Sequence, residues 1–231
     1  MNRKEKMDWR FNGIWWDQLQ DDTIFRKDFK EPSKWVTNND LSDSEYAVIW
    51  HLKGKVNSFE NLSDSEKLLY LELNWANIKD FIGIEKFSNL KRLELHYCTK
   101  LASDTGLSVL KDSLEFLHIN RSKKFVPTDE LLSLKKIKVL CLNECGNIDN
   151  LDFLSNFPEL IDFRFVNTNI LDGNLQPILD HPTIRSAGFL NKRHYNYKYE
   201  KIDSILDDKF AIDNKIYAYK GEYRTFRYDY E

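Results

Sequence analysis

The sequence lacks any long apolar run. No segment reaches the roughly 18 consecutive apolar residues that a membrane-spanning helix requires. Residues 1–16 mix basic residues such as Lys4 and Arg10 with acidic ones, and they contain no apolar stretch typical of a secretory signal. We therefore expect a chain that neither enters a membrane nor is secreted, and we assign it to the cytoplasm.

Cysteine and excess charge are also scarce. The three cysteines, Cys98, Cys141 and Cys145, are an odd number without a CxxC pair, which argues against a disulfide framework and indicates a reducing compartment. Lys and Arg number 34 and Asp and Glu 37, so the formal net charge is only −3. Bulk electrostatics of this size favour neither a nucleic acid nor an anionic membrane as a partner, and we expect neither.

Familiar catalytic signatures are missing as well. The chain contains no P-loop, no GxSxG and no HExxH sequence. We therefore predict that the protein is not an enzyme, and we expect no cofactor and no metal.

What the sequence does contain is one repeated pattern, L-x-x-L-x-L, whose ninth position is usually a small residue. The pattern begins six times, at intervals of 22 to 24 residues: Leu68, Leu90, Leu114, Ile137, Leu160 and Ile184. A unit of this length is too small to bury its own leucines, so neighbouring units must stack on one another. Each unit is expected to supply one parallel strand followed by a turn or short helix.

Over residues 47–191 this pattern resembles the leucine-rich-repeat family. Residues 68–87 and 137–157 look like the bacterial internalin type, and residues 90–110 look like the cysteine-containing type. The resemblance implies an α/β fold, namely a solenoid with a curved parallel sheet on its concave face and short helices or turns on its convex face. We leave open whether a weaker unit, with Ala47, Trp50 and Leu52 in the same register, adds a seventh strand.

Aromatic residues gather before and after the repeats. Four of the six tryptophans lie near the start: Trp9, Trp15, Trp16 and Trp35. We interpret residues 1–46 as an N-terminal cap that covers the exposed end of the stack, with a binding anchor at Trp15 and Trp16 as the alternative. Residues 192–231 are predicted to form a C-terminal cap, in which alternating tyrosines around Lys220 and Gly221 indicate a hairpin.

Strand alternation selects the side chains that are free to meet a partner. Positions 4 and 6 of each unit enter the core, whereas positions 3, 5 and 7 line the concave face and position 8 lies at its rim. Aromatic and charged residues gather at these outward positions in the first three units, which is the mixture typical of a binding hot spot. The predicted protein-binding site consists of Tyr70, Glu72, Trp75, Arg92, Glu94, His96, Tyr97, Phe116, His118 and Arg121.

The same face offers an alternative chemistry. Glu72 and Glu94 are expected to be neighbours across adjacent strands, with His118 next in the column, which would suit a carboxylate pair or a metal. A flat sheet face lacks a pocket that excludes water, however, and Arg92 offers a neighbouring counter-charge.

We therefore expect a non-enzymatic module that binds a protein ligand on its concave face and is a monomer outside that complex. A repeat protein of this size, rich in Asn, Lys, Ile and Asp, also resembles bacterial immunity proteins, and the ligand would then be a toxin domain. The alternatives are an adaptor or recognition subunit of a larger complex, or an enzyme with a site at the C-terminal cap around His194, Tyr195 and Tyr197.

Overall fold

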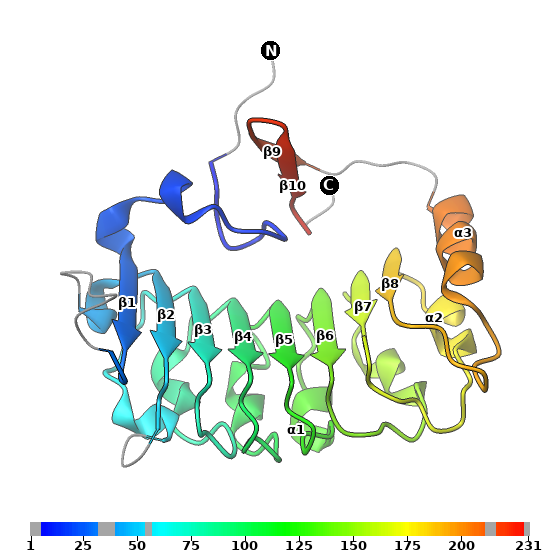
Figure 1. Cartoon of the computed structure of the whole chain (residues 1–231), viewed down its shortest axis with the longest axis horizontal. Helices are drawn as coiled ribbons and strands as arrows, with labels where there is room; N and C mark the ends of the chain where they lie inside the picture. The colour runs from blue at the N-terminus through cyan, green and yellow to red at the C-terminus, as the bar shows by residue number, and fades with distance from the viewer. Residues whose placement is uncertain (1–5, 32–39, 54–56, 211–215, 229–231) are drawn as a thin grey trace.

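A computed structural model describes residues 6–31, 40–53, 57–210 and 216–228. Trp35, counted above with the N-terminal tryptophans, lies outside these residues. The described chain is an α/β fold built on an open sheet of eight parallel strands, which follow one another in chain order from β1 to β8 (Figure 1). A separate antiparallel hairpin completes the structure.

The strands are short and evenly spaced along the repeats. Those of the sheet are β1 (Ile24–Asp28), β2 (Tyr46–Trp50), β3 (Tyr70–Asn74), β4 (Arg92–His96), β5 (Phe116–Asn120), β6 (Val139–Asn143), β7 (Asp162–Arg164) and β8 (Ser186–Gly188). Those of the hairpin are β9 (Tyr217–Lys220) and β10 (Tyr223–Phe226), which confirms the hairpin predicted around Lys220 and Gly221.

Short helical segments alternate with the strands. The α-helices are α1 (Asp129–Leu132), α2 (Gln176–Asp180) and α3 (Tyr199–Lys209). The 3-10 segments are Trp16–Gln18, Asp21–Thr23, Leu41–Asp43, Phe59–Asn61, Ile84–Phe87, Leu107–Leu110 and Asp152–Asn156. None of the helices among the described residues is both long and apolar enough to cross a membrane.

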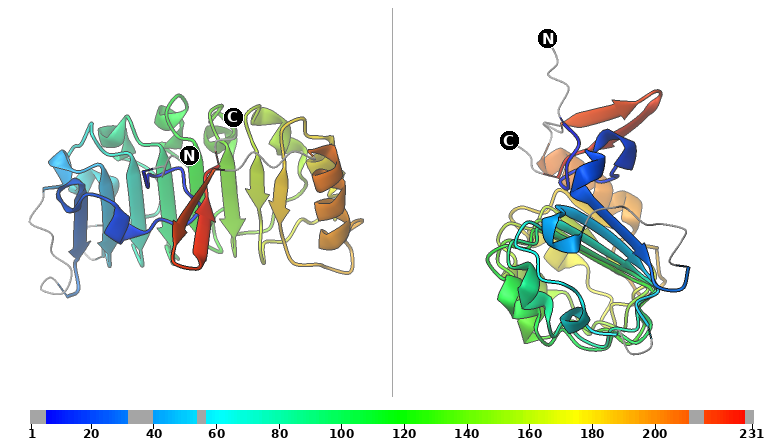
Figure 2. Two further views of the ribbon diagram at one scale, coloured as in Figure 1. Left: turned by 90° about the horizontal axis from the view of Figure 1, so that it is seen from above. Right: turned by 90° about the vertical axis from the view of Figure 1, so that its left-hand side faces the viewer.

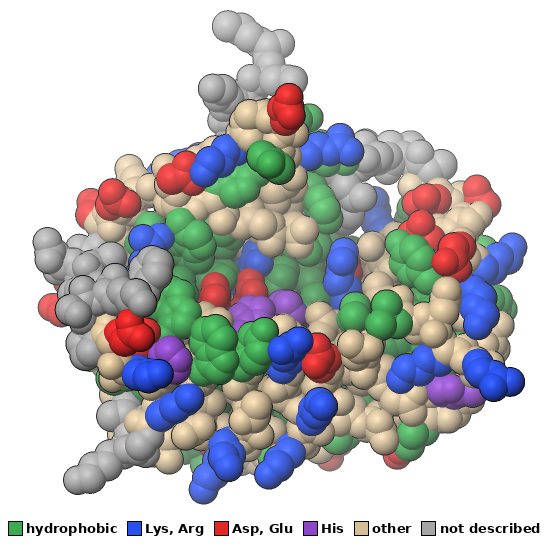
Figure 3. Space-filling view, viewed as in Figure 1, with side chains coloured by type: hydrophobic (Ala, Val, Ile, Leu, Met, Phe, Trp, Pro, Cys, Tyr) green, Lys and Arg blue, Asp and Glu red, His purple; other side chains and the backbone are tan. Residues whose placement is uncertain are grey.

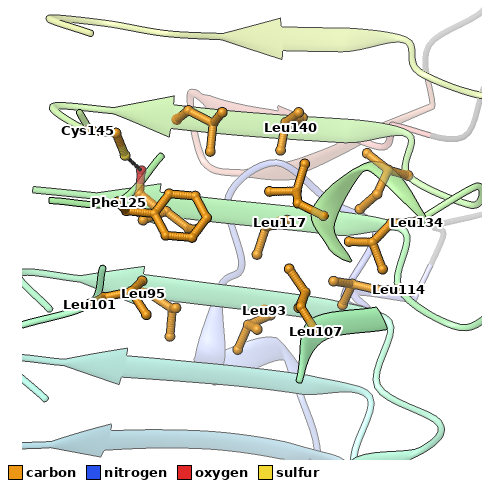
Figure 4. Close-up of a cluster of buried hydrophobic side chains, with 14 of the residues drawn as sticks. Leu93, Leu95, Leu101, Leu107, Leu114, Leu117, Phe125, Leu134, Leu140 and Cys145 are labelled. Carbon is orange, nitrogen blue, oxygen red and sulfur yellow. Dashed lines mark hydrogen bonds between the residues drawn. The ribbon is translucent and has the colours of Figure 1, made fainter. Parts of the chain in front are cut away.

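The repeated leucines form the core in the predicted way. Leu71, Leu93, Leu117 and Leu140 are paired in register across β3 to β6, and each is fully buried. Figure 4 shows Leu93, Leu117 and Leu140 among buried side chains contributed by the turns behind the sheet. Because position 4 of every unit enters the same core, the inward and outward alternation predicted from the sequence is confirmed.

The weaker unit before Leu68 is a strand, but its register was placed wrongly. Ala47 pairs with Leu71 and Ile49 with Leu73, so these two residues hold the core positions 4 and 6. Trp50 falls on the opposite face and Leu52 takes the ninth position. The leucine template fails here because Ala47 stands at position 4, where the units from β3 to β6 carry leucine.

Strand β1 was not predicted, since it lies in the segment assigned to the N-terminal cap. It pairs with β2 so that Phe25 stands beside Ala47 and Lys27 beside Ile49. Lys27 is exposed at a position that is apolar in the strands from β2 to β6. A charged residue directed toward the core side of an edge strand discourages pairing with another chain, which suits the strand at the edge of the sheet.

The two ends of the chain meet over one face of the sheet. Residues 6–20 and 216–228, which we call the roof, lie on the side opposite the helical turns (Figures 1 and 2). They are joined by hydrogen bonds from Asn12 N to Phe226 O at 2.8 Å and from Tyr228 N to Arg10 O at 3.1 Å. Both caps were expected at the ends of the row of strands. Within the predicted C-terminal cap, α3 does pack on β8 at that end, whereas the hairpin of β9 and β10 lies over the face of the sheet (Figure 1).

Candidate functional site

The face beneath the roof carries a polar network centred on Glu94 of β4. Glu94 Oε1 accepts a hydrogen bond from Arg92 Nε at 2.7 Å, and Oε2 lies 2.9 Å from His96 Nε2 and 3.5 Å from His118 Nδ1. Glu72 and His118 stand beside Glu94 on the neighbouring strands, as the sequence predicts. The expected counter-charge from Arg92 is also present.

The network favours the charged forms of Glu94 and His96. Burial alone would raise the pKa of Glu94, but the Arg92 guanidinium and the bonds from His118 and His96 outweigh burial and keep that pKa well below its usual value. Burial would lower the pKa of His96, but the bond to Glu94 reverses the sign and raises it. The carboxylate is therefore a permanent buried charge with a cation and two imidazoles around it.

Three groups of this network are close enough to hold a metal. Glu94, His96 and His118 offer ligand atoms within 4.8 Å of one another, and zinc accepts such a His₂Glu set. Asn143 opposes this use, because its Oδ1 accepts a bond from Val166 N at 2.8 Å and so directs its Nδ2 donor to His118 Nε2 at 3.1 Å. His118 then carries its hydrogen on Nδ1, facing Glu94, and offers no lone pair there. The arrangement favours hydrogen bonding around the carboxylate over metal ligation.

The roof covers the inner part of the predicted binding site. Tyr70, Arg92 and Phe116, all at position 3, are only 2%, 3% and 4% exposed. The rings of Tyr70 and Phe116 pack edge-on against Trp16 and Tyr228 of the roof, with centroids 5.4 and 5.3 Å apart. The Arg92 guanidinium donates to three backbone carbonyls of the roof: Trp9 O, Phe11 O and Asn12 O. These residues were expected to face solvent and instead bind the chain's own ends.

Three predicted residues, Trp75, Tyr97 and Arg121, lie in a row where strands β2 to β6 end, and we call this row the exit edge. It consists of the position-8 side chains His51, Trp75, Tyr97, Arg121 and Glu144. His51 stacks on Trp75 at 5.5 Å between centroids, and Trp75 stacks on Tyr97 at 4.9 Å. The Arg121 guanidinium lies 4.8 Å from the Tyr97 ring centroid and pairs with Glu144 at 3.1 Å. Four successive units thus place their side chains in one continuous stack, and Glu144 of the fifth pairs with the arginine at its end.

An unusual backbone conformation produces this stack. The φ angles of Trp75, Tyr97 and Arg121 are 53°, 59° and 58°, in the left-handed region that bulky residues seldom adopt. Each of these residues still donates its N–H to the neighbouring unit, as Trp75 N does to His96 O at 2.8 Å. The strained turn therefore recurs at the same position and directs successive side chains along one edge.

A recess separates the exit edge from the roof. Figure 3 shows a hollow between them in which acidic and histidine side chains are visible. Glu72, His96 and His118 are partly exposed, unlike the buried Glu94. The recess is thus polar, and its outer rim is the exit edge.

The ten predicted site residues therefore fall into three groups. Beneath the roof or at the centre of the network lie Tyr70, Arg92, Glu94 and Phe116. In the recess lie Glu72, His96 and His118. On the exit edge lie Trp75, which is 40% exposed, and Tyr97 and Arg121. The predicted site leaves out two neighbours on this edge. Glu144 follows from position 8 of the repeat, whereas His51 belongs to the unit whose register the sequence pattern misplaces.

The three cysteines are buried in the packed parts of the protein. Cys98, Cys141 and Cys145 are free and buried, and burial raises the pKa of Cys98 and of Cys145 to about 12. Cys141 faces the roof beside Tyr228 instead of solvent.

The side chains of the proposed C-terminal enzymatic site bond to nearby groups of the chain itself. Tyr195 OH accepts from Ile170 N at 3.2 Å, His194 Nε2 lies 2.9 Å from Ile170 O, and Tyr197 OH donates to Gln176 Oε1 at 2.6 Å. These contacts attach the segment after β8 to the preceding unit.

Comparisons of the chain with protein-family models, with curated proteins and with solved structures gave no match.

Proposed function

We propose that this chain is a leucine-rich-repeat protein that binds a protein ligand through the exit edge and the adjoining recess, without catalysing a reaction. The repeat assignment is supported by strands that recur every 22 to 24 residues, pair in register and bury the same positions. The recurring left-handed residue at position 8 supports it further.

The observation that carries the binding proposal is the exposed stack on the exit edge. Trp75 is 40% exposed although it lies beside a well-packed core, and its ring stacks between those of His51 and Tyr97. A preformed surface of Trp, Tyr and Arg loses little conformational entropy on binding, and these residue types dominate the energetics of protein interfaces.

The contact surface proposed here is smaller than the one predicted from the sequence, because the roof covers part of the predicted surface. The roof occupies the face at Tyr70, Arg92 and Phe116, so a ligand approaching from outside first meets the rim and the recess. The concave-face proposal is therefore narrowed to the part of that face beside the exit edge.

Affinity capture from cell extract tests this proposal. The bait is the full chain, compared with the double variant Trp75→Gly, Tyr97→Gly, because glycine suits the left-handed backbone and removes only the rings. The matched control is Tyr219→Ala, Tyr223→Ala, which removes two tyrosines that are 62% and 77% exposed on the hairpin.

We expect a protein that is retained by the wild type and the control and lost by the exit-edge variant. A protein lost only by the hairpin control would move the binding site to the roof. Identical captures by all three baits would contradict the proposal.

The resemblance to immunity proteins gives a narrower form of the proposal, in which the ligand is a toxin domain. Co-expression with a toxin encoded beside this chain tests it, with cell survival as the measurement. Survival that depends on Trp75 and Tyr97 is expected, and killing despite abundant folded protein would remove this form while leaving the general proposal standing.

A further inference from the structure

The turns that follow the exit edge carry a row of lysines, which we call the lysine strip. Its members are exposed and lie one to three residues after the ninth position of their units: Lys53, Lys79, Lys100, Lys123 and Lys124. Figure 3 shows basic side chains gathered beneath the row of histidine and hydrophobic side chains at the rim. The aromatic stack therefore has a basic flank.

The strip is not neutralised by the chain itself. Within the described residues none of its five lysines forms an ion pair. At the opposite edge, where the strands begin, lysines do pair with carboxylates of neighbouring units: Lys67 with Asp43, Lys91 and Lys138 with Glu115, and Lys136 with Glu159. The two edges of one sheet thus differ in electrostatic balance.

Nearby carboxylates do not offset the strip. Across the described residues 51–53, 74–82, 96–102 and 120–126 the one acidic residue is Asp80, whose Oδ1 accepts a bond from Ile82 N at 3.1 Å. Glu144 is engaged with Arg121. Glu72 in the recess accepts bonds from Tyr70 and Asn74. This stretch of surface is therefore positive although the whole chain has a formal charge of −3.

We infer that the exit edge and lysine strip together bind an acidic surface of a protein, whose carboxylates meet the strip while an apolar patch meets the edges of Trp75 and Tyr97. This inference rests on the proposed function and names the chemistry of its ligand. Complementary charge of this kind accelerates association and selects among partners, since exposed lysines meet carboxylates without first breaking pairs of their own.

A basic surface with aromatic rings also suggests single-stranded nucleic acid, but the rings are turned the wrong way for it. Bases bind such proteins by stacking on a free aromatic face. His51 and Tyr97 cover the two faces of Trp75, and Trp75 and Arg121 cover the two faces of Tyr97. Only ring edges remain accessible, which suits side chains of a protein.

The test compares two polyanions of similar charge, poly-L-glutamate and oligothymidylate of roughly 20 units each, titrated against the full chain by fluorescence anisotropy. The strip variant is Lys79→Glu, Lys100→Glu, Lys123→Glu. The control variant, Lys67→Glu, Lys111→Glu, Lys201→Glu, makes the same change in net charge with exposed lysines elsewhere.

We expect poly-L-glutamate to bind the wild type and the control, and this binding should weaken as salt rises from about 50 to about 200 mM. Its affinity for the strip variant should be lower by roughly tenfold or more. Oligothymidylate should bind no more tightly than poly-L-glutamate and should be insensitive to Trp75→Gly, Tyr97→Gly. Equal losses in the strip and control variants would overturn the inference. So would tight oligothymidylate binding that needs both rings, which would make this edge a nucleic-acid site.

The capture experiment separates the inference from the proposed function. A captured protein lost by both the strip variant and Trp75→Gly, Tyr97→Gly supports both. A protein lost by the ring variant but retained by the strip variant would contradict the inference that the ligand is acidic, and the proposed function would still hold. A capture unchanged by either variant removes the proposed function itself.

Discussion

Positions 3 and 8 of the repeat carry similar side chains, aromatic rings and arginines, but they lie in different surroundings. At position 3, Tyr70, Arg92 and Phe116 are 2% to 4% exposed, whereas Trp75 at position 8 is 40% exposed. The difference arises outside the repeats, because the roof settles on position 3 and stops short of position 8. Residue type alone therefore does not separate a side chain that binds the chain's own ends from one available to a partner, and substitutions should affect stability at position 3 and binding at position 8.

The largest effect is expected from Arg92→Ala. Arg92 compensates the buried charge of Glu94 and donates to three carbonyls of the roof. Removing one partner of a buried ion pair costs about 3–5 kcal/mol, so the free energy of unfolding should fall by that amount in a denaturant titration. Arg121→Ala is the control, since its pair with Glu144 is partly open to solvent and worth at most about 1 kcal/mol. Equal losses for the two variants would erase the distinction between the positions.

Much of the sheet was predictable because it depends on local periodicity. The spacing of Leu71, Leu93 and Leu117 sets which face each strand buries, and neighbouring units supply the partner. Strand β1 was missed because Lys27 stands at an otherwise apolar position, so the pattern that reveals the other strands is broken there.

The roof could not be predicted in the same way. The bond from Gly13 N to Thr225 Oγ1, for example, joins residues 212 positions apart, and no repeated pattern links the two segments. The sequence therefore predicts which positions of the first units face outward, but the division of these positions into a covered and an exposed part depends on contacts that periodicity does not encode.

A second prediction concerns attachment of the roof. Tyr228 packs on Phe116 with centroids 5.3 Å apart and covers Cys141, which is 4% exposed. Tyr228→Ala should weaken this cover by roughly 2–3 kcal/mol, so labelling of Cys141 by a thiol reagent should accelerate at least about tenfold. Peptide-resolved mass spectrometry measures the rate. Cys98 and Cys145 serve as internal controls because they lie in the leucine core on the other side of the sheet, away from Tyr228. Parallel acceleration at all three cysteines would indicate global loosening instead.

A third prediction concerns the backbone of the exit edge. Tyr97 has a φ of 59°, where an L-residue pays about 1–2 kcal/mol that glycine does not. Tyr97→Gly should therefore be more stable than Tyr97→Ala by about 1 kcal/mol, measured by denaturant unfolding. At Tyr219, in strand β9, the order should reverse, because glycine in a strand is less favourable than alanine. If the glycine variant were the more stable at both sites, or the alanine variant at both, backbone strain at Tyr97 would not explain the difference.

The smallest expected effect is a pH dependence at the recess. The pKa of His96 is raised in the folded protein, so its bond to Glu94 contributes stability below the unfolded pKa, about 6.5, and this contribution is lost as pH rises through the folded pKa. Burial lowers the pKa of His181, which destabilises the folded state at low pH and so gives stability the opposite dependence on pH; the wild-type profile therefore mixes the two contributions. The difference in unfolding free energy between wild type and His96→Gln cancels the His181 contribution, and it should be largest near pH 6 and shrink as pH rises.

A constant difference across the range would show that His96 acts only as a neutral hydrogen-bond donor to Glu94. A difference that grows with pH would mean that the recess disfavours the protonated ring, contrary to the charge arrangement around Glu94. The expected decrease with pH would separate the recess from the covered face, since Arg92 stays charged over the whole range and its contribution beneath the roof should not depend on pH.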